Sequence, residues 1–159
     1  MTTARTMSRS AASVLSLSLV AAMFVAPSAH AGARMAQRPG ADDLAQEMLR
    51  LVNRSREVRG LPELRMNGRL CKEALRHSRS MARIGAISHT SNLADLVHGV
   101  GGSVFGEDLG KGRGLQGIRD AWLRGAETNR IMLDPRFHHV GLGVVHVGGF
   151  YWVTFQAFD

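Results

Sequence analysis

The sequence predicts an α+β domain in which helices lie on either side of an antiparallel sheet. Over residues 44–122, apolar residues recur mostly at the spacing of amphipathic helices. Two β-rich runs follow, His139–Val147 and Phe150–Phe158, and Gly148-Gly149 joins them as a two-residue hairpin turn. The final run carries bulky side chains on both of its alternating faces, so that strand must be covered from two sides.

The N-terminal segment is predicted to be an export signal rather than part of the fold. Two arginines precede an uncharged apolar run over residues 11–26, and small residues lead up to Ala31, where we expect cleavage. The run is shorter than the roughly 20 residues that a membrane-spanning helix needs. We therefore expect residues 1–31 to be a signal peptide, 32–42 a flexible lead and 43–159 one folded domain. The mature protein is then secreted, extracellular or associated with the cell wall, with no transmembrane segment.

Two long helices are predicted to begin the domain. Asp42 or Asp43 is positioned to cap the first helix, which Gly60 ends. Asn67 is positioned to cap the second helix, whose apolar stripe stops at Gly85.

The middle of the chain is less regular. A shorter helix is expected to begin at residue 91 or 92, and a fourth helix is expected over 115–122. Residues 99–114 between them are rich in glycine, and only 104–109 is predicted to be extended. A brief turn is predicted at 131–133, before a proline.

The charge of the chain is basic. Lys and Arg number 20 against 13 Asp and Glu, which gives a formal net charge of +7. An anionic partner is one interpretation. The arginines are scattered along the sequence, which favours an ordinary solvated surface, and no specific nucleic-acid partner is predicted.

One histidine and one glutamate could carry chemistry. His89 follows the predicted end of the second helix, and Glu107 lies in the extended stretch that comes later. An imidazole and a carboxylate from separate elements could orient one another or share a metal ion. From their spacing alone, two ordinary surface residues are the competing interpretation.

Other residues give weaker signals. The single cysteine excludes an intramolecular disulfide scaffold, and its helical neighbours predict that Cys71 is buried. His77 lies on the apolar stripe of its helix, which favours a hydrogen-bonded residue of the core or its boundary. Residues 110–114 lack the ending of a phosphate-binding P-loop and are interpreted as a mobile loop. No G-x-S-x-G nucleophile elbow is present in the sequence.

Several motifs occur in an order that resembles a known family. They are residues 53–82, the SHTS around His89, the GEDL around Glu107, Ala121-Trp122, and the ending FHHVGLGVV…GGFYWVTFQAF. On these motifs the chain resembles the CAP superfamily, the SCP-like extracellular proteins, in their compact bacterial form. The resemblance covers residues 43–158 and implies a three-layer α-β-α sandwich with a central antiparallel sheet.

The resemblance also implies a ligand-binding cleft. Family members often line it with two histidines and acidic residues, which in some cases hold a divalent metal. His89 matches the first histidine, and Glu107 matches the glutamate of the usual GEN, here followed by Asp108 instead of Asn. Thr128 falls where the second histidine is expected, and a hydroxyl is a poor zinc ligand. We therefore expect no cofactor, with a divalent metal such as zinc at His89 and Glu107 as the weaker alternative.

The preferred functional hypothesis is a secreted domain that binds a lipid, a cell-wall component or a protein in this cleft, without catalysis. The alternative is a secreted hydrolase in which His89 is the general base, Glu107 orients it, and a metal or Thr128 assists. The threonine at position 128 favours binding over hydrolysis. In the alternative, Glu127 or His139 is a candidate to replace the missing histidine.

Overall fold

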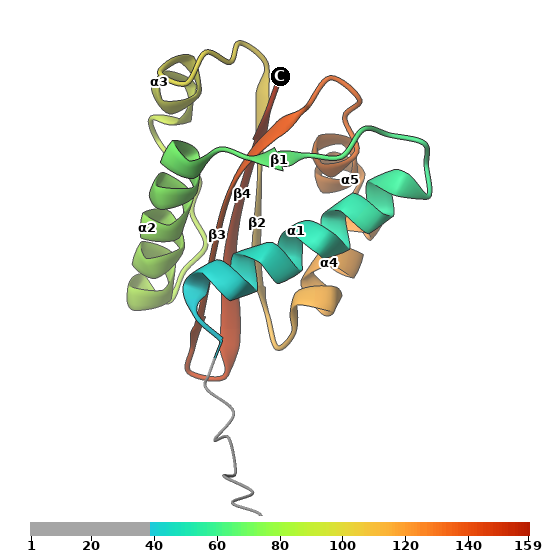
Figure 1. The fold of residues 1–159 in the computed structure, drawn as a ribbon. Coiled ribbons are helices and arrows are strands. Elements are labelled where there is room, and N and C mark those ends of the chain that lie inside the picture. The colour runs from blue at the N-terminus through green and yellow to red at the C-terminus, as the bar shows by residue number, and fades with distance from the viewer. Residues whose placement is uncertain (1–38) are drawn as a thin grey trace, which may run out of the picture. The chain divides into compact units, whose positions relative to one another are not determined.

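The structure, a computed structural model, describes residues 39–159. The predicted signal peptide, 1–31, and residues 32–38 of the predicted lead lie outside the described residues. Within the described part, a four-stranded sheet lies between two groups of helices (Figure 1). None of the helices between residues 39 and 159 has the length and apolar character needed to cross a membrane.

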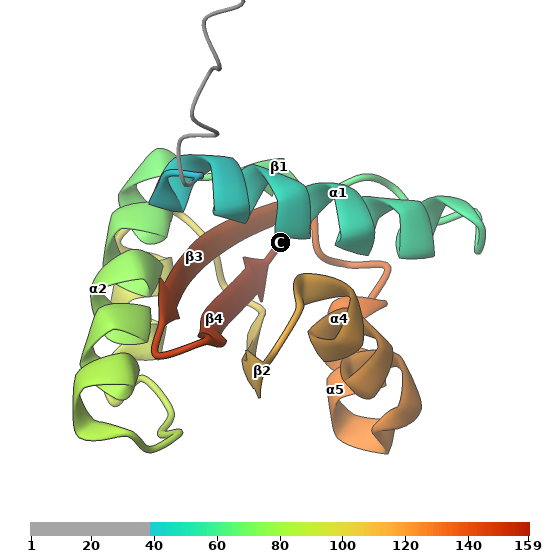
Figure 2. The ribbon, with the colours of Figure 1, turned by 90° about the horizontal axis from the view of Figure 1, so that it is seen from below.

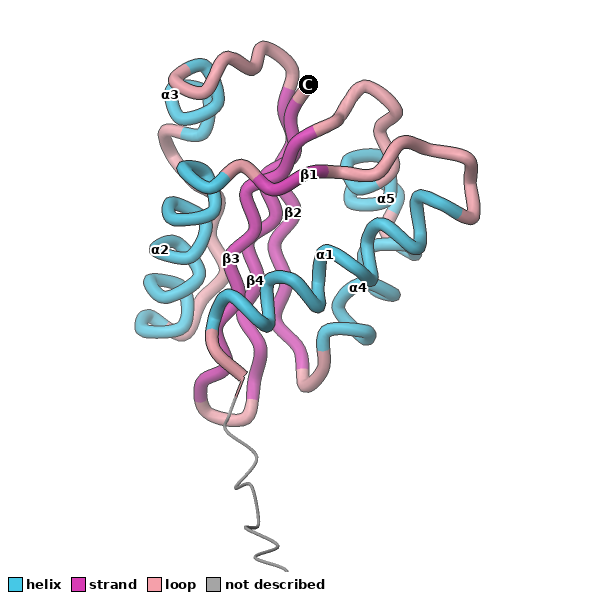
Figure 3. Tube along the Cα trace, in the orientation of Figure 1, coloured by secondary structure: helices cyan, strands magenta, loops and turns pink. Residues whose placement is uncertain are grey.

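The sheet has the strand order β1-β3-β4-β2, which Figure 3 traces along the backbone. Its strands are β1 (Arg65–Met66), β2 (Phe105–Gly112), β3 (His139–Val147) and β4 (Phe150–Phe158). The three long strands pair antiparallel, as predicted, whereas the two-residue β1 pairs parallel with β3. Two residues are too few to show an alternating pattern, so the sequence contained no signal for β1.

The helices form the two outer layers, which Figure 2 shows from below. On one face of the sheet lie α1 (Ala41–Glu57), α4 (Leu115–Arg124) and α5 (Ala126–Met132). On the other face lie α2 (Gly68–Ile84) and α3 (Leu93–His98). This arrangement confirms the α-β-α sandwich that the resemblance implied.

The predicted helix and hairpin signals are largely confirmed. Asn67 accepts a hydrogen bond from the backbone N–H of Leu70, which caps α2. The N-cap of α1 is Gly40 rather than an aspartate, because the helix begins earlier than predicted; Asp43 instead accepts a hydrogen bond from the Gly40 N–H. The hairpin glycines between β3 and β4 both have positive φ, 61° and 76°, as a tight turn requires.

The two faces of the sheet have different interiors. The face toward α1, α4 and α5 is almost wholly apolar. On the face toward α2, Trp152 and Phe158 belong to two separate apolar clusters at opposite ends of β4. Between these clusters, Thr154 and Gln156 are fully buried. The predicted two-sided covering of β4 is therefore confirmed, with a polar layer in the middle of one side.

Two glycines in β3 allow α2 to lie directly on the sheet. A Cβ atom on Gly143 would stand 2.2 Å from the backbone N of Leu75. A Cβ atom on Gly141 would stand 2.4 Å from Cγ of Leu70. Both distances are impossible for real atoms, so these glycines set how closely the helix approaches the strand.

The prediction of a mobile loop at 110–114 is wrong for its first three residues, because β2 continues through Gly112. The glycines in this strand serve helix packing rather than flexibility. A Cβ atom on Gly110 or Gly112 would collide with Ile118 of α4, at 2.4 and 2.9 Å.

The brief turn predicted at 131–133 is also wrong, because Ile131 and Met132 end a true helix, α5. Gly125 separates this helix from α4. The segment 126–132 is short and has few apolar residues, so the sequence showed no clear helical periodicity there.

Candidate functional site

The structure brings His89 and Glu107 together. Glu107 lies on β2 with its side chain toward α2, and His89 lies in the segment that follows the end of α2. Gly85 ends α2 in a left-handed conformation, with φ of 76°, which turns the chain toward β2. The Nδ1 atom of His89 then lies 2.8 Å from Oε1 of Glu107.

The Glu107 carboxylate is buried and fully hydrogen-bonded. Its side chain is 3% exposed. Oε1 also accepts a hydrogen bond from the Thr90 N–H at 2.9 Å, and Oε2 accepts from the Thr90 hydroxyl at 2.5 Å and from Nε2 of Gln156 at 2.9 Å. Burial alone would raise the pKa of Glu107, but these donors and His89 outweigh it and lower the pKa below its usual value. The glutamate is therefore an anion at neutral pH.

This anion determines the orientation of the His89 ring. A carboxylate can only accept hydrogen bonds, so Nδ1 of His89 carries the proton that it donates to Glu107. Nε2 is then the acceptor nitrogen of the neutral ring, and the side chain is 75% exposed. The arrangement presents a fixed imidazole acceptor to solvent, supported from behind by a buried charge.

Sequence reasoning missed two residues of this site, Thr90 and Gln156. Gln156 lies directly opposite Glu107 in the register of β2 and β4, and it also donates to the Thr90 hydroxyl at 2.9 Å. A glutamine in a mostly apolar strand was the available signal, since a buried amide needs hydrogen-bond partners.

Thr128, the third predicted cleft residue, is not brought to this pair. It lies on α5, and its hydroxyl donates to the backbone carbonyl of Trp122 at 2.8 Å and contacts that of Gly125 at 3.3 Å. The two candidates to replace the missing histidine, His139 and Glu127, are not brought to this pair either. The ring of His139 stacks on Phe158 with centroids 5.1 Å apart, and Glu127 is exposed.

The residues do not fit the divalent metal that the resemblance raised. All the hydrogen bonds to Glu107 reach the two oxygens a metal would need, and Nδ1 of His89 faces that same carboxylate. Only Nε2 of His89 is left as a ligand atom. Within residues 39–159 there is no group of three or more His, Cys, Asp or Glu side chains placed to hold a metal ion.

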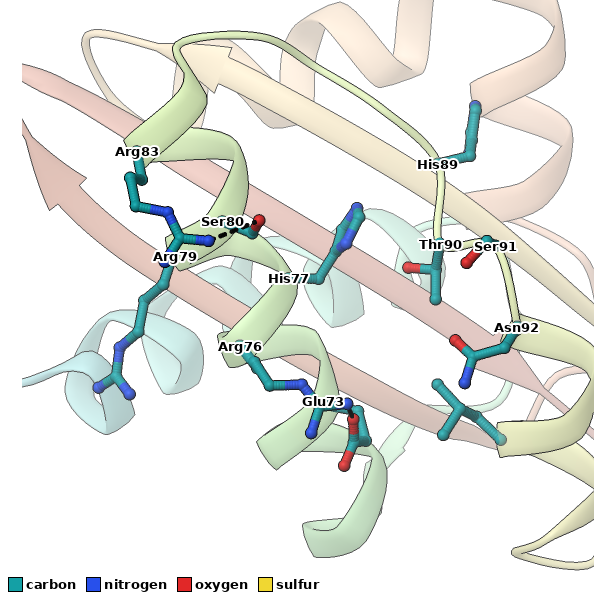
Figure 4. Close-up of a pocket in the computed structure, with 11 residues that line it drawn as sticks. Glu73, Arg76, His77, Arg79, Ser80, Arg83, His89, Thr90, Ser91 and Asn92 are labelled. Atoms are coloured by element: carbon teal, nitrogen blue, oxygen red, sulfur yellow. Dashed lines mark hydrogen bonds and ion pairs between the residues drawn. The ribbon is translucent and has the colours of Figure 1, made fainter.

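A groove of about 570 Å³ begins at His89 and runs along α2. One wall is the exposed face of α2, and the other is the segment 89–92, as Figure 4 shows. His77 stands between the two walls, and its Nε2 lies 2.6 Å from the Ser88 carbonyl oxygen. This position confirms the predicted boundary histidine. The volume is in the range of ordinary small-ligand sites.

Asp108, the neighbour of Glu107, points to the opposite face of the sheet. It is 1% exposed, and among residues 39–159 neither of its carboxyl oxygens has a hydrogen-bond partner. Burial, and next the nearby charge of Glu107, raise the pKa of Asp108 to about 8. The side chain is thus a neutral acid in the apolar layer and lies away from the groove.

Comparisons with known proteins address the family and the fold. The model of the cysteine-rich secretory protein family, CAP, matches residues 49–157. An uncharacterized Bacillus subtilis protein, YkwD, is 26% identical over 117 residues, which are 69% of this chain and 46% of that protein. The chain therefore spans less than half the length of this curated relative.

Solved structures show the same fold. An extracellular SCP-domain protein of Bacillus anthracis is 26% identical, with a TM-score of 0.58 over 72% of this chain and 40% of that one. An outer surface protein of Borrelia burgdorferi is 15% identical, with a TM-score of 0.64 over 72% of this chain and 90% of that one. The cysteine-rich secretory protein of Staphylococcus aureus is 14% identical, with a TM-score of 0.60 over 76% and 40%. The last two identities are low, so these two likenesses concern the fold alone.

Proposed function

Because this chain belongs to the CAP family of cysteine-rich secretory proteins, we propose that it is an exported, non-catalytic domain that binds a ligand in the groove beside His89. The ligand is a lipid, a cell-wall component or a protein. The sequence contains a single cysteine, so the domain performs this role without an internal disulfide.

The observation that carries the proposal is the exposed His89 ring held by the buried Glu107 carboxylate at 2.8 Å. A side chain that is already ordered loses little conformational entropy when a ligand contacts it. The free Nε2 of His89 accepts a hydrogen bond from a ligand hydroxyl or amide, and the groove provides the volume for the rest of the ligand.

Two requirements of covalent hydrolysis, a proton donor at Glu107 and a hydroxyl nucleophile on His89, are not met by these contacts. Glu107 is held as an anion by its donors, so it does not supply a proton to a leaving group. Among residues 39–159, Glu107 is the only side chain that hydrogen-bonds to the ring of His89, so no serine or threonine hydroxyl is placed as a nucleophile. These features support an orienting role for Glu107.

The binding role is tested with the exported protein, by co-sedimentation with purified cell-wall fragments and with phospholipid vesicles. We expect one of these materials to retain the wild type, and His89→Ala to weaken that retention about tenfold through the lost hydrogen bond. His138→Ala is the matched control, because this histidine is exposed outside the groove. Equal retention of wild type and His89→Ala would overturn the role of His89.

The hydrolase alternative is tested separately. The proposal expects no turnover of peptide, ester or glycan panels by the wild type. Turnover that disappears in His89→Ala, while the unfolding temperature stays unchanged, would replace binding by catalysis as the function.

A further inference from the structure

The exposed face of α2 is the most basic surface along the groove. This helix carries five basic residues and one acidic residue. Arg76, Arg79 and Arg83 all line the groove, and Figure 4 shows them in a row along the helix. Their spacing of three and four residues places them on neighbouring turns of one helix face.

Two of these arginines keep their charge free for a ligand. Arg76 is paired with Glu73, one turn earlier on the same helix. In the part of the chain that the structure describes, Arg79 and Arg83 make no ion pair, and both are exposed. Within residues 39–159, the one hydrogen bond of the Arg83 side chain goes to the Ser80 hydroxyl, at 3.5 Å. A guanidinium without a carboxylate partner is well suited to bind phosphate oxygens.

The opposite wall of the groove has a different chemistry. It presents the hydroxyl of Ser91 and the amide of Asn92, whereas the Thr90 hydroxyl beside them is engaged with Glu107 and Gln156. A hydroxyl and an amide can form hydrogen bonds with hydroxyl groups of a ligand. The lining contains no Phe, Tyr or Trp, so the groove lacks the aromatic platforms that stack nucleic-acid bases.

We propose that the groove binds a polymer of phosphate groups joined by hydroxylated carbon units, either a polyol phosphate or a phosphorylated glycan. Arg79 and Arg83 bind the phosphates, and the 89–92 segment binds the hydroxyls. This inference rests on the proposed function, because it assigns a ligand class to the same groove.

The experiment measures the affinity of the full exported chain for fluorescently labelled poly(glycerol phosphate) by anisotropy. We expect Arg79→Gln with Arg83→Gln to weaken binding at least about tenfold and to reduce its dependence on salt, since two ionic contacts are lost. The matched control is Arg50→Gln with Arg54→Gln, an exposed pair at the same spacing on α1. The control pair is expected to change affinity less than twofold.

Three further probes decide between ligand classes. Uncharged polyglycerol is expected not to bind, because it lacks phosphate. Vesicles of phosphatidylglycerol that bind while the soluble polymer does not would overturn the proposal in favour of a membrane surface. Single-stranded DNA of equal charge that binds as tightly as the polymer would show attraction to any polyanion, which also overturns it.

The outcome for His89→Ala in the same assay separates this inference from the proposed function. If polymer binding depends on His89 but not on Arg79 and Arg83, the phosphate assignment fails and the binding role of His89 stands. If polymer binding depends on the two arginines but not on His89, the phosphate assignment stands and the role of His89 fails.

Discussion

The two faces of the sheet each bury a carboxyl group, and they shift its pKa in opposite directions. On the α2 face, Glu107 accepts four hydrogen bonds and remains charged. On the α4 and α5 face, its neighbour Asp108 has none among the described residues, and its pKa is raised to about 8. The comparison teaches that the available donors, more than the depth of burial, decide whether a buried acid keeps its charge.

The largest loss of stability is expected when Glu107, the hydrogen-bonded carboxylate on the α2 face, is removed. Glu107→Ala removes the acceptor of the Thr90 N–H, of the Thr90 hydroxyl and of one N–H of Gln156, and it releases the His89 ring. We expect a loss of about 3 kcal/mol in the free energy of unfolding, measured by urea denaturation. Glu63→Ala, at an exposed site, serves as the control. A loss as small as that of the control would mean that the hydrogen-bonded carboxylate contributes little.

The next largest effect concerns Asp108 on the opposite face and is a dependence of stability on pH. The folded pKa of Asp108 lies above its unfolded value, so the folded state keeps a proton that the unfolded state releases. Stability therefore falls as pH rises toward about 8, by up to about 1.4 kcal/mol per pH unit.

This pH effect is measured by comparing wild type with Asp108→Asn. From about pH 6 to pH 7.5 we expect the wild type to lose about 2 kcal/mol more than the variant, because the amide does not titrate. Parallel stability curves would show that Asp108 is charged in the folded state.

A smaller effect is expected from Ser78→Ala, which tests how much the polar layer beneath α2 contributes to stability. The Ser78 hydroxyl donates to the Gly143 carbonyl at 2.9 Å and lies 2.8 Å from the Thr154 hydroxyl. Its removal is expected to reduce stability by about 1 kcal/mol. Ser91→Ala, at an exposed position, is the reference for thermal unfolding. Equal melting temperatures would mean that this layer adds nothing to α2 docking.

The smallest effect is expected from zinc. Both oxygens of Glu107 are occupied by donors, so added zinc is expected to leave the melting temperature unchanged. A bound ion at a hundred times its Kd would add about 2.7 kcal/mol. Calorimetric binding at micromolar zinc that disappears in His89→Ala would contradict this prediction.

Much of the fold was readable from the sequence because its signals are local or periodic. Both long C-terminal strands have the predicted bounds, and their glycine pair forms the predicted turn. The glycines at 110 and 112 were misread, because glycine is typical both of mobile loops and of strands that pack closely against a helix. Only the position of α4 in the structure shows that these two glycines serve close packing.

The site was readable in part. The His89–Glu107 pair followed from motif order, and the structure brings the two side chains together. Thr90 and Gln156 were missed because they meet Glu107 from separate elements, and such contacts leave no periodicity in the chain. Asp108 was visible as a departure from the usual Asn, but its face of the sheet depends on strand register.

The two glycines of β3 beneath α2 fix the position of the helix that forms one wall of the groove. With Gly141 and Gly143 already at the limit of backbone approach, α2 has no slack in which to move inward. Arg79 and Arg83 are four residues apart, which on a fixed helix is about 6 Å along the axis. The proposed polymer therefore meets two arginines whose backbone positions are fixed, and only their side chains can adjust to its charge spacing.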